Sequence, residues 1–475
     1  MTALNLAARI AAGELSAGEA LEEAISRTEA VHARLNAVTR TLYDEARAEV
    51  AAGLPEGPFT GVPFPLKDLS ISYAGVPTTG GSRAMADMPA LRDSELMRRY
   101  RAAGMVAYCK TNTPELGSLG TTEPLLFGPC RNPWNPEHSC GGSSGGSAVL
   151  VAARAVPIAH ATDGAGSIRI PASCCGIFGL KPTRARITMG PDVGEAVGGI
   201  ANEHAVSISV QDNAALLDAT QGGMPGDPYA CPPPERPFAK DVGADPGRLR
   251  IAFTDRSITG TSLHPDCVAA VRDTAKLLED LGYDVEEAAP PLDVETFREF
   301  YIRFWPFSVA RHERRLSRAA GRPVDRSLFE PFNRYLLEKT DSILAADYLA
   351  DLAWFHGMSR DFAAFMEGYA LWLTPTLGHP PPRLGHFDCD AYGGPEVMER
   401  FMQFLPFTPF ANLTGQPSAT LPLHWNAEGL PVGSLLTARY GDEAMLFRVS
   451  AQLEEARPWA GRIPPGYGGE EGGGD

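Results

Sequence analysis

Positive charge is scarce in this sequence of 475 residues. Lysine and arginine together number 42 against 58 aspartates and glutamates, which leaves a formal net charge of -16. Nucleic acids and anionic membrane surfaces are both bound through clustered basic side chains. The composition therefore argues against either of them as a partner.

Long hydrophobic runs are also missing. No stretch reaches the ~18–20 apolar residues that a membrane-spanning helix needs. The first residues lack the basic start of a secretory signal, and acidic residues, beginning with Glu14 and Glu19, follow at once. These features predict a cytoplasmic protein.

The eight cysteines form no C-x-x-C pair, and no group of cysteines and histidines has the spacing of a zinc site. A disulfide framework is not expected in a chain of this length without a signal peptide. We therefore predict that most of the cysteines are buried free thiols.

Helices and strands alternate along the predicted chain. Helices are expected over 16–36, 44–53, 93–104, 147–155, 264–282 and 441–455, and strands over 61–67, 105–110, 157–162, 249–253 and 284–288. Residues 417–438 are typical of a hairpin, residues 222–247 of a long surface loop, and residues 293–370 of an aromatic-rich helical region. The alternation favours an α/β fold with a parallel or mixed sheet covered by helices.

A glycine-rich turn that ends in a serine is the first sign of chemistry. The apolar strand over 157–162 runs into Asp163-Gly-Ala-Gly-Ser167. Small residues let the backbone approach a ligand closely, and successive N–H groups in such a turn can converge on one anion. A carbonyl that becomes a tetrahedral oxyanion needs a donor cluster of this kind. Ser167 would place its hydroxyl beside that cluster.

A serine hydroxyl is a weak nucleophile and needs a base. His138 and His160 are the histidines nearest to the serine segments, and His160, on an apolar strand, is expected to be a core residue. Lys67 follows the apolar run 62–66, where burial would lower its pKa and let it accept a proton. A lysine taken alone is more often a surface charge, so the assignment depends on the neighbouring motifs.

Other interpretations of the glycine-rich segments remain open at this point. Residues 142–146 also match G-x-S-x-G, the nucleophile elbow of α/β-hydrolases, with Ser144 as nucleophile and His386 or His424 as a distant partner. A phosphate cradle is disfavoured because no G-x-x-x-x-G-K-[ST] is present and residues 164–169 lack the third glycine of a dinucleotide fingerprint.

Several ordered motifs resemble the amidase signature family. They are Gly-Gly-Ser-Ser-Gly-Gly-Ser over 141–147, Asp-Gly-Ala-Gly-Ser-Ile-Arg-Ile-Pro over 163–171, Cys-Gly-Ile-Phe-Gly-Leu-Lys-Pro-Thr over 175–183 and Lys-Thr-Asn-Thr-Pro-Glu over 110–115. Residues 373–376, 412–417 and 429–433 resemble the C-terminal motifs of the same family. The resemblance covers nearly the whole chain and is weakest over about 222–370.

The resemblance implies a role for each matching residue. Ser167 matches the nucleophile, Ser143 the serine that follows a cis peptide bond and passes the proton, and Lys67 the base. The backbone N–H groups of four consecutive residues match the oxyanion hole: Gly164, Ala165, Gly166 and Ser167. Three residues match supporting positions: Asp163 and Arg169, as a buried ion pair that shapes the loop, and Ser144.

One position departs from the commoner family pattern, since Ala165 stands where that pattern has glycine. With a positive φ this alanine would cost about 1 kcal/mol, and with a negative φ almost nothing. The form of residues 163–173 is similar to that of the subgroup containing 6-aminohexanoate cyclic-dimer hydrolase, which points towards linear or cyclic secondary amides.

The family implies one amidase signature domain over 1–475, with a large mixed sheet between helical layers. The expected parts are N-terminal helices (1–60), a catalytic core (61–221), a variable substrate-binding region (about 230–370), a return to the core (371–463) and a disordered tail (464–475). The implied activity is hydrolysis of a small amide through an acyl-enzyme, without metal or organic cofactor. The alternative is the glutaminase-type subunit of a tRNA-dependent amidotransferase, and base rates suggest a homodimer.

Overall fold

An eight-stranded mixed sheet forms the centre of the molecule. A computed structural model describes residues 1–467, and the strand order in this sheet is β4-β6-β5-β10-β11-β9-β7-β8. The strands are β4 (Ile158–Asp163), β5 (Phe178–Lys181), β6 (Asn202–Ser207), β7 (Arg250–Phe253), β8 (Asp284–Glu287), β9 (Leu371–Pro375), β10 (Ser418–Trp425) and β11 (Pro431–Ala438). Pairings from β4 to β9 are antiparallel, and those of β7 with β9 and β8 are parallel. The mixed sheet expected from the sequence is confirmed.

A second sheet of three strands lies beside the first. It has the order β1-β3-β2, formed by β1 (Val38–Thr41), β3 (Val106–Thr111) and β2 (Pro63–Lys67). β2 also contacts β4 of the large sheet, although the two strands are not paired. Instead, the backbone N–H of Lys67 on β2 donates to the ring of His160 on β4. The strands that the sequence predicts near the N-terminus therefore form their own sheet, and β2 meets the large sheet through a side chain.

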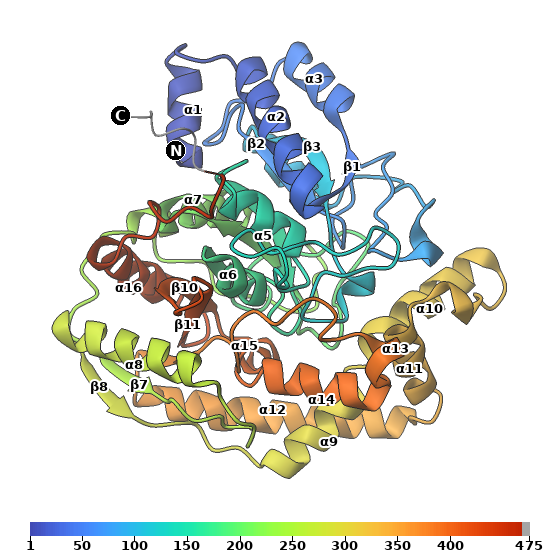
Figure 1. Cartoon of the computed structure of the whole chain (residues 1–475), viewed down its shortest axis with the longest axis vertical. Coiled ribbons are helices and arrows are strands. Elements are labelled where there is room, and N and C mark those ends of the chain that lie inside the picture. Colours follow the sequence, from blue (N-terminus) through green and yellow to red (C-terminus); the bar gives the residue numbers. More distant parts are fainter. Residues whose placement is uncertain (468–475) are drawn as a thin grey trace.

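Helices fill the space around both sheets. They are α1 (Ala3–Ala11), α2 (Ala17–Leu35), α3 (Tyr43–Ala52), α4 (Glu95–Ala102), α5 (Gly145–Ala152), α6 (Arg169–Cys175), α7 (Val210–Thr220), α8 (Pro265–Asp280), α9 (Val294–Phe304), α10 (Phe307–Ala320), α11 (Pro331–Thr340), α12 (Ala345–Glu367), α13 (Cys389–Tyr392), α14 (Gly394–Phe404), α15 (Thr408–Thr414) and α16 (Glu443–Ala456). Figure 1 places α1, α2 and α3 at one end of the molecule, next to the three-stranded sheet. Ser16 caps α2 with the predicted capping box.

Alternate residues of the strands divide the helices between the two faces of the large sheet. In β4, Ile158 belongs to the hydrophobic cluster that includes α7 and α16, whereas Ala159 belongs to the cluster around α5. In β6, Ala205 and Val206 divide in the same way. Because successive side chains of a strand point to opposite faces, α5 covers one face, and α7 and α16 cover the other. The sheet is thus enclosed by helical layers, as predicted.

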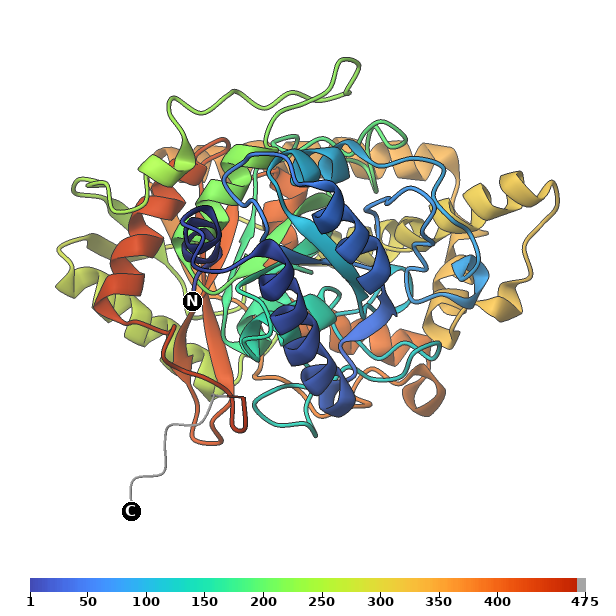
Figure 2. The ribbon, with the colours of Figure 1, turned by 90° about the horizontal axis from the view of Figure 1, so that it is seen from above.

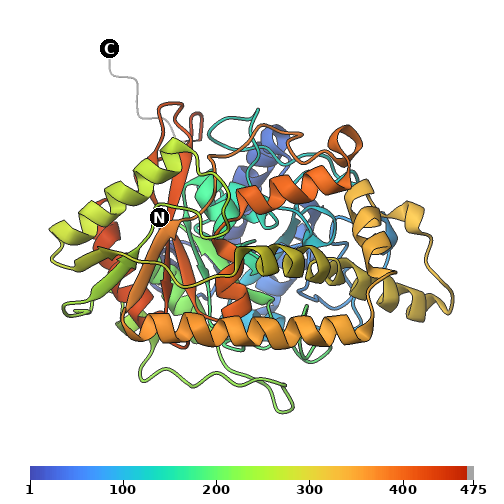
Figure 3. The same ribbon diagram turned by 90° about the horizontal axis from the view of Figure 1, so that it is seen from below.

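The region predicted as variable contains both core and helical parts. Strands β7 and β8 and helix α8, within residues 250–287, extend the large sheet at one edge. The remaining part, α9 to α12, packs its aromatic side chains into one buried cluster that includes Phe297, Phe300 and Phe304. Figure 3 shows α12 as a long helix across this side of the molecule. The aromatic residues of this region are therefore mainly core residues.

Two predicted irregular segments have different outcomes. Residues 222–247 contain no strand and one short 3-10 helix, Phe238–Lys240, and Figure 2 shows the segment extending away from the body as a light green loop. The predicted disordered tail largely falls on residues 468–475, which lie outside the described residues. Residues 464–467 are ordered against α2, because Arg34 donates to the carbonyl of Gly466 and stacks on Tyr467.

Candidate active site

The side chain of Lys67 lies at the end of β2 and is fully buried. Its Nζ donates to Ser143 Oγ at 2.7 Å and to Thr162 Oγ1 at 2.8 Å. Both partners are neutral hydroxyls, and neither Asp163 nor Glu203 lies within ion-pair distance of this nitrogen among the described residues. The lysine therefore lies in a buried setting without a charged partner, in direct contact with one of the two predicted catalytic serines.

This setting changes the proton affinity of Lys67. Burial disfavours the charged ammonium and lowers its pKa to about 7, although the carboxylates of Asp163 and Glu203 act in the opposite direction. A lysine with this pKa is substantially neutral at neutral pH. It can therefore accept a proton from a hydroxyl, which is what a general base requires.

Ser143 precedes helix α5 in the predicted glycine-rich segment. The Gly142–Ser143 peptide bond is cis, in agreement with the family pattern. The next residue, Ser144, donates its hydroxyl to the carbonyl of Thr162 and accepts from the Thr162 N–H, both at 3.2 Å. Its backbone N–H donates to the carbonyl of Ser167 at 3.2 Å. Ser144 thus joins the Ser143 segment to β4 and to the Ser167 turn.

Ser167 lies in the turn between β4 and α6, with 7% of its surface exposed. The structure brings this turn against the Ser143 segment, but in the described part of the chain the hydroxyls of Ser143 and Ser167 are not hydrogen-bonded to each other. The buried strand followed by a turn that ends in this serine agrees with the sequence prediction, and helix α6 follows the turn. The predicted nucleophile is thus near the surface of the site, while the predicted relay and base are beneath it.

Asp163 holds the turn in shape. Arg169 donates to both of its carboxylate oxygens at 2.9 Å, and the pair is fully buried. Asn412 from α15 donates to the same carboxylate at 2.9 Å and to the Asp163 carbonyl at 3.0 Å. Burial opposes ionisation, but Arg169 and Asn412 outweigh it and lower the pKa of Asp163 to about 2. The carboxylate is therefore a permanent anchor for the loop.

The predicted oxyanion donors differ in what they already bind. The Gly166 N–H donates to Asp163 Oδ1 at 2.7 Å, so this donor is engaged inside the loop. Gly166 has φ 132°, and a Cβ there would lie 2.5 Å from Thr408 Oγ1. Ala165 is not among the described residues with positive φ. Its alanine therefore carries no left-handed strain, and the departure from the family pattern has little conformational cost.

Behind Lys67 lies a pair of residues that the sequence motifs did not identify as functional. His160 Nδ1 accepts the Lys67 backbone N–H at 3.2 Å, so its hydrogen is carried by Nε2. That nitrogen faces Glu203 Oε2 at 3.5 Å, and both side chains are buried. His160 is a core residue, as predicted, but its contact is with the backbone of the candidate base. The sequence offered one signal for this contact, namely the polar His160 within an otherwise apolar strand.

The rival nucleophile elbow is not supported by the structure. The Ser144 hydroxyl is occupied by the backbone of Thr162. His386 makes edge-to-face contacts with His379 and Phe387, and His424 lies 4.0 Å from Asp273. Neither histidine makes a described contact with Ser144. The hydrogen bonds of this serine thus join the Ser143 segment to β4.

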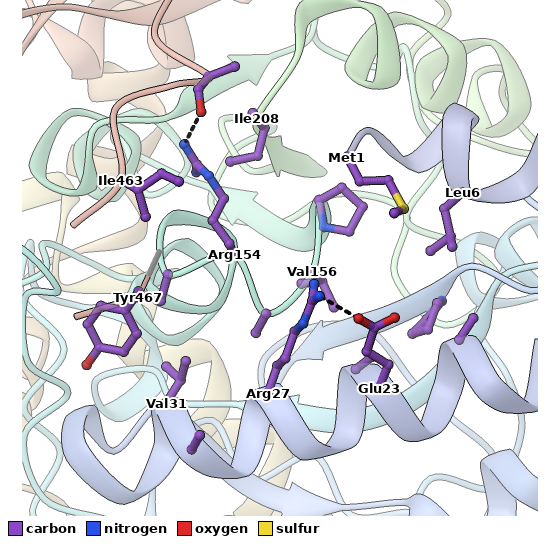
Figure 4. Close-up of a pocket in the computed structure, with 18 of the residues that line it drawn as sticks. Met1, Leu6, Glu23, Arg27, Val31, Arg154, Val156, Ile208, Ile463 and Tyr467 are labelled. Carbon is purple, nitrogen blue, oxygen red and sulfur yellow. Dashed lines mark hydrogen bonds and ion pairs between the residues drawn. The ribbon is translucent and has the colours of Figure 1, made fainter. Parts of the chain in front are cut away.

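A separate hollow of about 510 Å³ lies away from the serines. It is bordered by α2, by residues 153–157 and by residues 460–467. Figure 4 shows its mainly aliphatic walls, the ion pair of Arg27 with Glu23, and the bond from Arg154 to a backbone carbonyl. None of the predicted catalytic residues borders this hollow.

No group of histidine, cysteine, aspartate and glutamate suited to holding a metal ion occurs within residues 1–467. All eight cysteines are free, and six of them are buried. The prediction that most of the cysteines are buried free thiols is therefore confirmed.

None of the described helices is both long and apolar enough to cross a membrane.

Comparison with known proteins identifies the family. The family model described as Amidase matches residues 19–447. The chain belongs to the amidase family. It is thus a hydrolase of carbon–nitrogen bonds in amides other than peptides, as its signature motifs predict.

Individual relatives agree with this membership. The chain is 38% identical over 469 residues to 6-aminohexanoate-cyclic-dimer hydrolase of Paenarthrobacter ureafaciens, covering 96% of this chain and 94% of that protein. It is 37% identical over 466 residues to a putative amidase, AmiC, of Mycobacterium leprae, covering 97% and 96%. A solved structure of 6-aminohexanoate cyclic dimer hydrolase superposes with a TM-score of 0.93 at 37% identity and covers 98% of both chains.

A likeness to the glutaminase-type alternative is confined to the fold. A glutamyl-tRNA(Gln) amidotransferase subunit from Thermotoga maritima superposes with a TM-score of 0.74 at 24% identity. The superposition covers 94% of this chain and 93% of the Thermotoga protein.

Proposed function

We propose that this amidase hydrolyses a small linear or cyclic amide to a carboxylate and an amine through an acyl-enzyme on Ser167. The observation that carries the proposal is the 2.7 Å contact between Lys67 Nζ and Ser143 Oγ in a fully buried setting. A lysine whose pKa is lowered to about 7 is able to act as the base of such a site.

The proposed reaction begins with proton transfer from Ser167 through Ser143 to neutral Lys67. Ser167 Oγ then forms a bond to the amide carbon, and the carbonyl oxygen becomes an oxyanion. We assign its stabilisation to the N–H groups of Gly164, Ala165 and Ser167, since the Gly166 N–H already donates to Asp163. The relay returns the proton to the departing nitrogen as the carbon–nitrogen bond breaks. Water, deprotonated by the same relay, releases the acid.

The substrate class follows from the relatives and from the motif over residues 163–173. Proteins similar to this chain are named 6-aminohexanoate-cyclic-dimer hydrolase, so we propose secondary amides of short amino acids as substrates. Initial assays should compare the 6-aminohexanoate cyclic dimer with a linear amide of the same acid and with a primary amide.

Labelling with a fluorophosphonate tests the nucleophile directly. A single adduct on the peptide that contains Ser167 is expected, and Ser167→Ala should abolish both labelling and turnover while leaving the fold intact. Intact mass, peptide mapping and circular dichroism provide the readouts. An adduct on Ser144, or hydrolysis by the Ser167→Ala variant, would overturn the assignment.

A further inference from the structure

A second cavity, of about 370 Å³, is bordered by an unusual number of carboxylates. It lies between the segment that follows β3, the start of α11 and the residues around α13. Helices α11 and α13 contact each other and are neighbours in Figure 1. Five acidic residues border the cavity: Glu115, Glu123, Glu330, Asp388 and Asp390.

These carboxylates lack basic partners, unlike several buried acids elsewhere. Asp163, Glu443 and Asp351 each pair with an arginine. Within residues 1–467, none of the five acids bordering the cavity has a lysine, arginine or histidine nitrogen within 4.0 Å. The charge of Arg83 favours the ionised forms of Glu115 and Glu330, and that of Arg131 favours the ionised form of Glu123. The cavity therefore gathers carboxyl groups to which the protein itself supplies no cationic partner.

Neutral donors engage both oxygens of Glu115 but only one oxygen of Glu330. Glu115 accepts from the Ser82 hydroxyl at 2.6 Å and from the Glu330 N–H at 2.7 Å. Glu330 accepts from the Leu125 N–H at 2.6 Å. Burial, and then the nearby charge of Glu115, raises the pKa of Glu330 to about 8. The ionisation of Glu115 thus disfavours that of Glu330, whereas a bound cation would allow both carboxyl groups to be charged.

An independent observation comes from the amide of Asn333, which is 1% exposed and borders the same cavity. Its Nδ2 donates to Glu115 Oε2 at 2.6 Å, which directs the amide oxygen away from that carboxylate. The oxygen, Oδ1, has no hydrogen-bond partner although it is buried. A buried acceptor without a donor is costly, so this oxygen indicates a missing donor.

We propose that this cavity binds the primary ammonium group of a small organic molecule. An ammonium group supplies three N–H donors, which match Glu115, Glu330 and the free oxygen of Asn333. The aliphatic and aromatic side chains of Leu119, Leu125, Phe332 and Phe387 also border the cavity and suit a methylene chain. Together they favour an alkylammonium over a bare metal ion, for which no suitable group occurs among the described residues.

The cavity lies close to the candidate catalytic serines. The short helix Glu115–Gly117 contributes Glu115 to its wall, while a Cβ placed on Gly117 would lie 3.0 Å from Ser143 Oγ. One backbone segment thus separates the acidic cavity from the proton relay. The ammonium group has two possible sources, the amino end of an amide substrate or a separate amine, and the first of these rests on the proposed function.

Calorimetric titration with n-butylammonium chloride tests the binding site itself. The full-length protein should bind one equivalent, n-butanol should not bind, and Glu330→Gln should weaken binding about tenfold or more, because a charged hydrogen bond is lost. At pH 7, binding should also release a proton from Glu330, measurable by titration in buffers of different ionisation enthalpy. The control is Glu137→Gln, an exposed carboxylate outside the cavity. Absence of binding, or equal binding by the Glu330→Gln protein, would overturn the proposal.

A second variant protects the test against misfolding. Asp388→Asn changes an exposed residue at the rim and leaves Glu115 and Glu330 intact. It should weaken butylammonium binding less than Glu330→Gln does, with unchanged circular dichroism. A larger effect at Asp388 than at Glu330 would contradict the assigned position of the ammonium group.

Kinetics distinguish the two sources of the ammonium group. If it is part of the substrate, kcat/KM for ω-aminoalkanamides should exceed that for alkanamides of equal length, and Glu330→Gln should reduce this ratio. If it belongs to a separate amine, butylammonium should alter the hydrolysis of a neutral amide without competing with it. Glu330-dependent binding together with no hydrolysis of any amide would refute the proposed function while leaving the cavity assignment intact.

Discussion

The properties of single residues in the site follow from burial. We propose Lys67 as the base because its surroundings disfavour the ammonium form, and its pKa of about 7 predicts the pH dependence of the enzyme. Below this value the lysine is protonated and cannot accept the serine proton. We therefore expect kcat/KM to fall as the pH decreases through about 7, with a limb of unit slope. A profile flat from pH 5 to pH 8 would contradict the role of Lys67 as base.

Glu203 should tune this limb from a distance. Its carboxylate is one of two that raise the pKa of Lys67 against the effect of burial. In the Glu203→Gln variant that stabilisation of the ammonium is lost, so the acidic limb should move to lower pH. The measurement is the pH profile of kcat/KM.

A matched control for this shift is Glu454→Gln. Glu454 is a largely buried acid on α16 whose pKa is raised to about 7, mainly by burial. It therefore titrates in the same range, but it does not contribute to the pKa of Lys67. If the acidic limb moved as far in the Glu454→Gln variant as in the Glu203→Gln variant, the limb would not arise from Lys67.

At the scale of structural elements, the β4–α6 turn depends on one glycine. Gly166 combines φ 132° with close contact to Thr408. Gly166→Ala should therefore lower kcat by about tenfold or more and destabilise the protein by roughly 1–3 kcal/mol. Denaturant unfolding and steady-state kinetics measure the two effects. Ala165→Gly, at a position with negative φ, serves as the control and should change both only slightly.

Local patterns predicted the elements, but not the contacts between distant elements. The capping box at Ser16, the strands on either side of α8 and the C-terminal hairpin all appear where local chemistry indicates. The signature motifs gave Lys67 and Ser143, which the structure brings into contact. The Lys67 contact with His160 was not predictable, because it arises where two separate sheets meet.

The hydrogen bond of the Gly166 N–H within the loop could not be predicted from the sequence for a similar reason. The motif identifies four consecutive backbone donors, and sequence alone cannot tell which of them a neighbouring carboxylate already occupies. Asp163 is held in place by Asn412 from the far end of the chain and accepts the Gly166 N–H. Likewise, the acids of the second cavity come from three segments that are far apart in sequence and meet only in the fold: residues 115–123, Glu330 and residues 388–390.

At the scale of the whole molecule, the site combines parts from both ends of the chain. Lys67, Ser143 and Ser167 lie in the N-terminal part, but Thr408 and Asn412 support the Ser167 turn. The exposed loop over 222–247 separates these parts without interrupting a strand. We expect fragments 1–234 and 235–475 to be inactive singly and active when coexpressed, since split chains reassemble best at exposed loops. Activity of fragment 1–234 alone would contradict this dependence.

The Asn412 contact also sets the moment at which the enzyme becomes competent during its synthesis. The asparagine that fixes Asp163 follows it by 249 residues. When the ribosome has synthesised Lys67, Ser143 and Ser167, it has therefore still to add Asn412, which holds the Ser167 turn through Asp163. Chains not yet translated as far as Asn412 would carry the proposed reactive groups without the side chain that anchors their loop, so we expect hydrolytic activity only from chains translated beyond this residue.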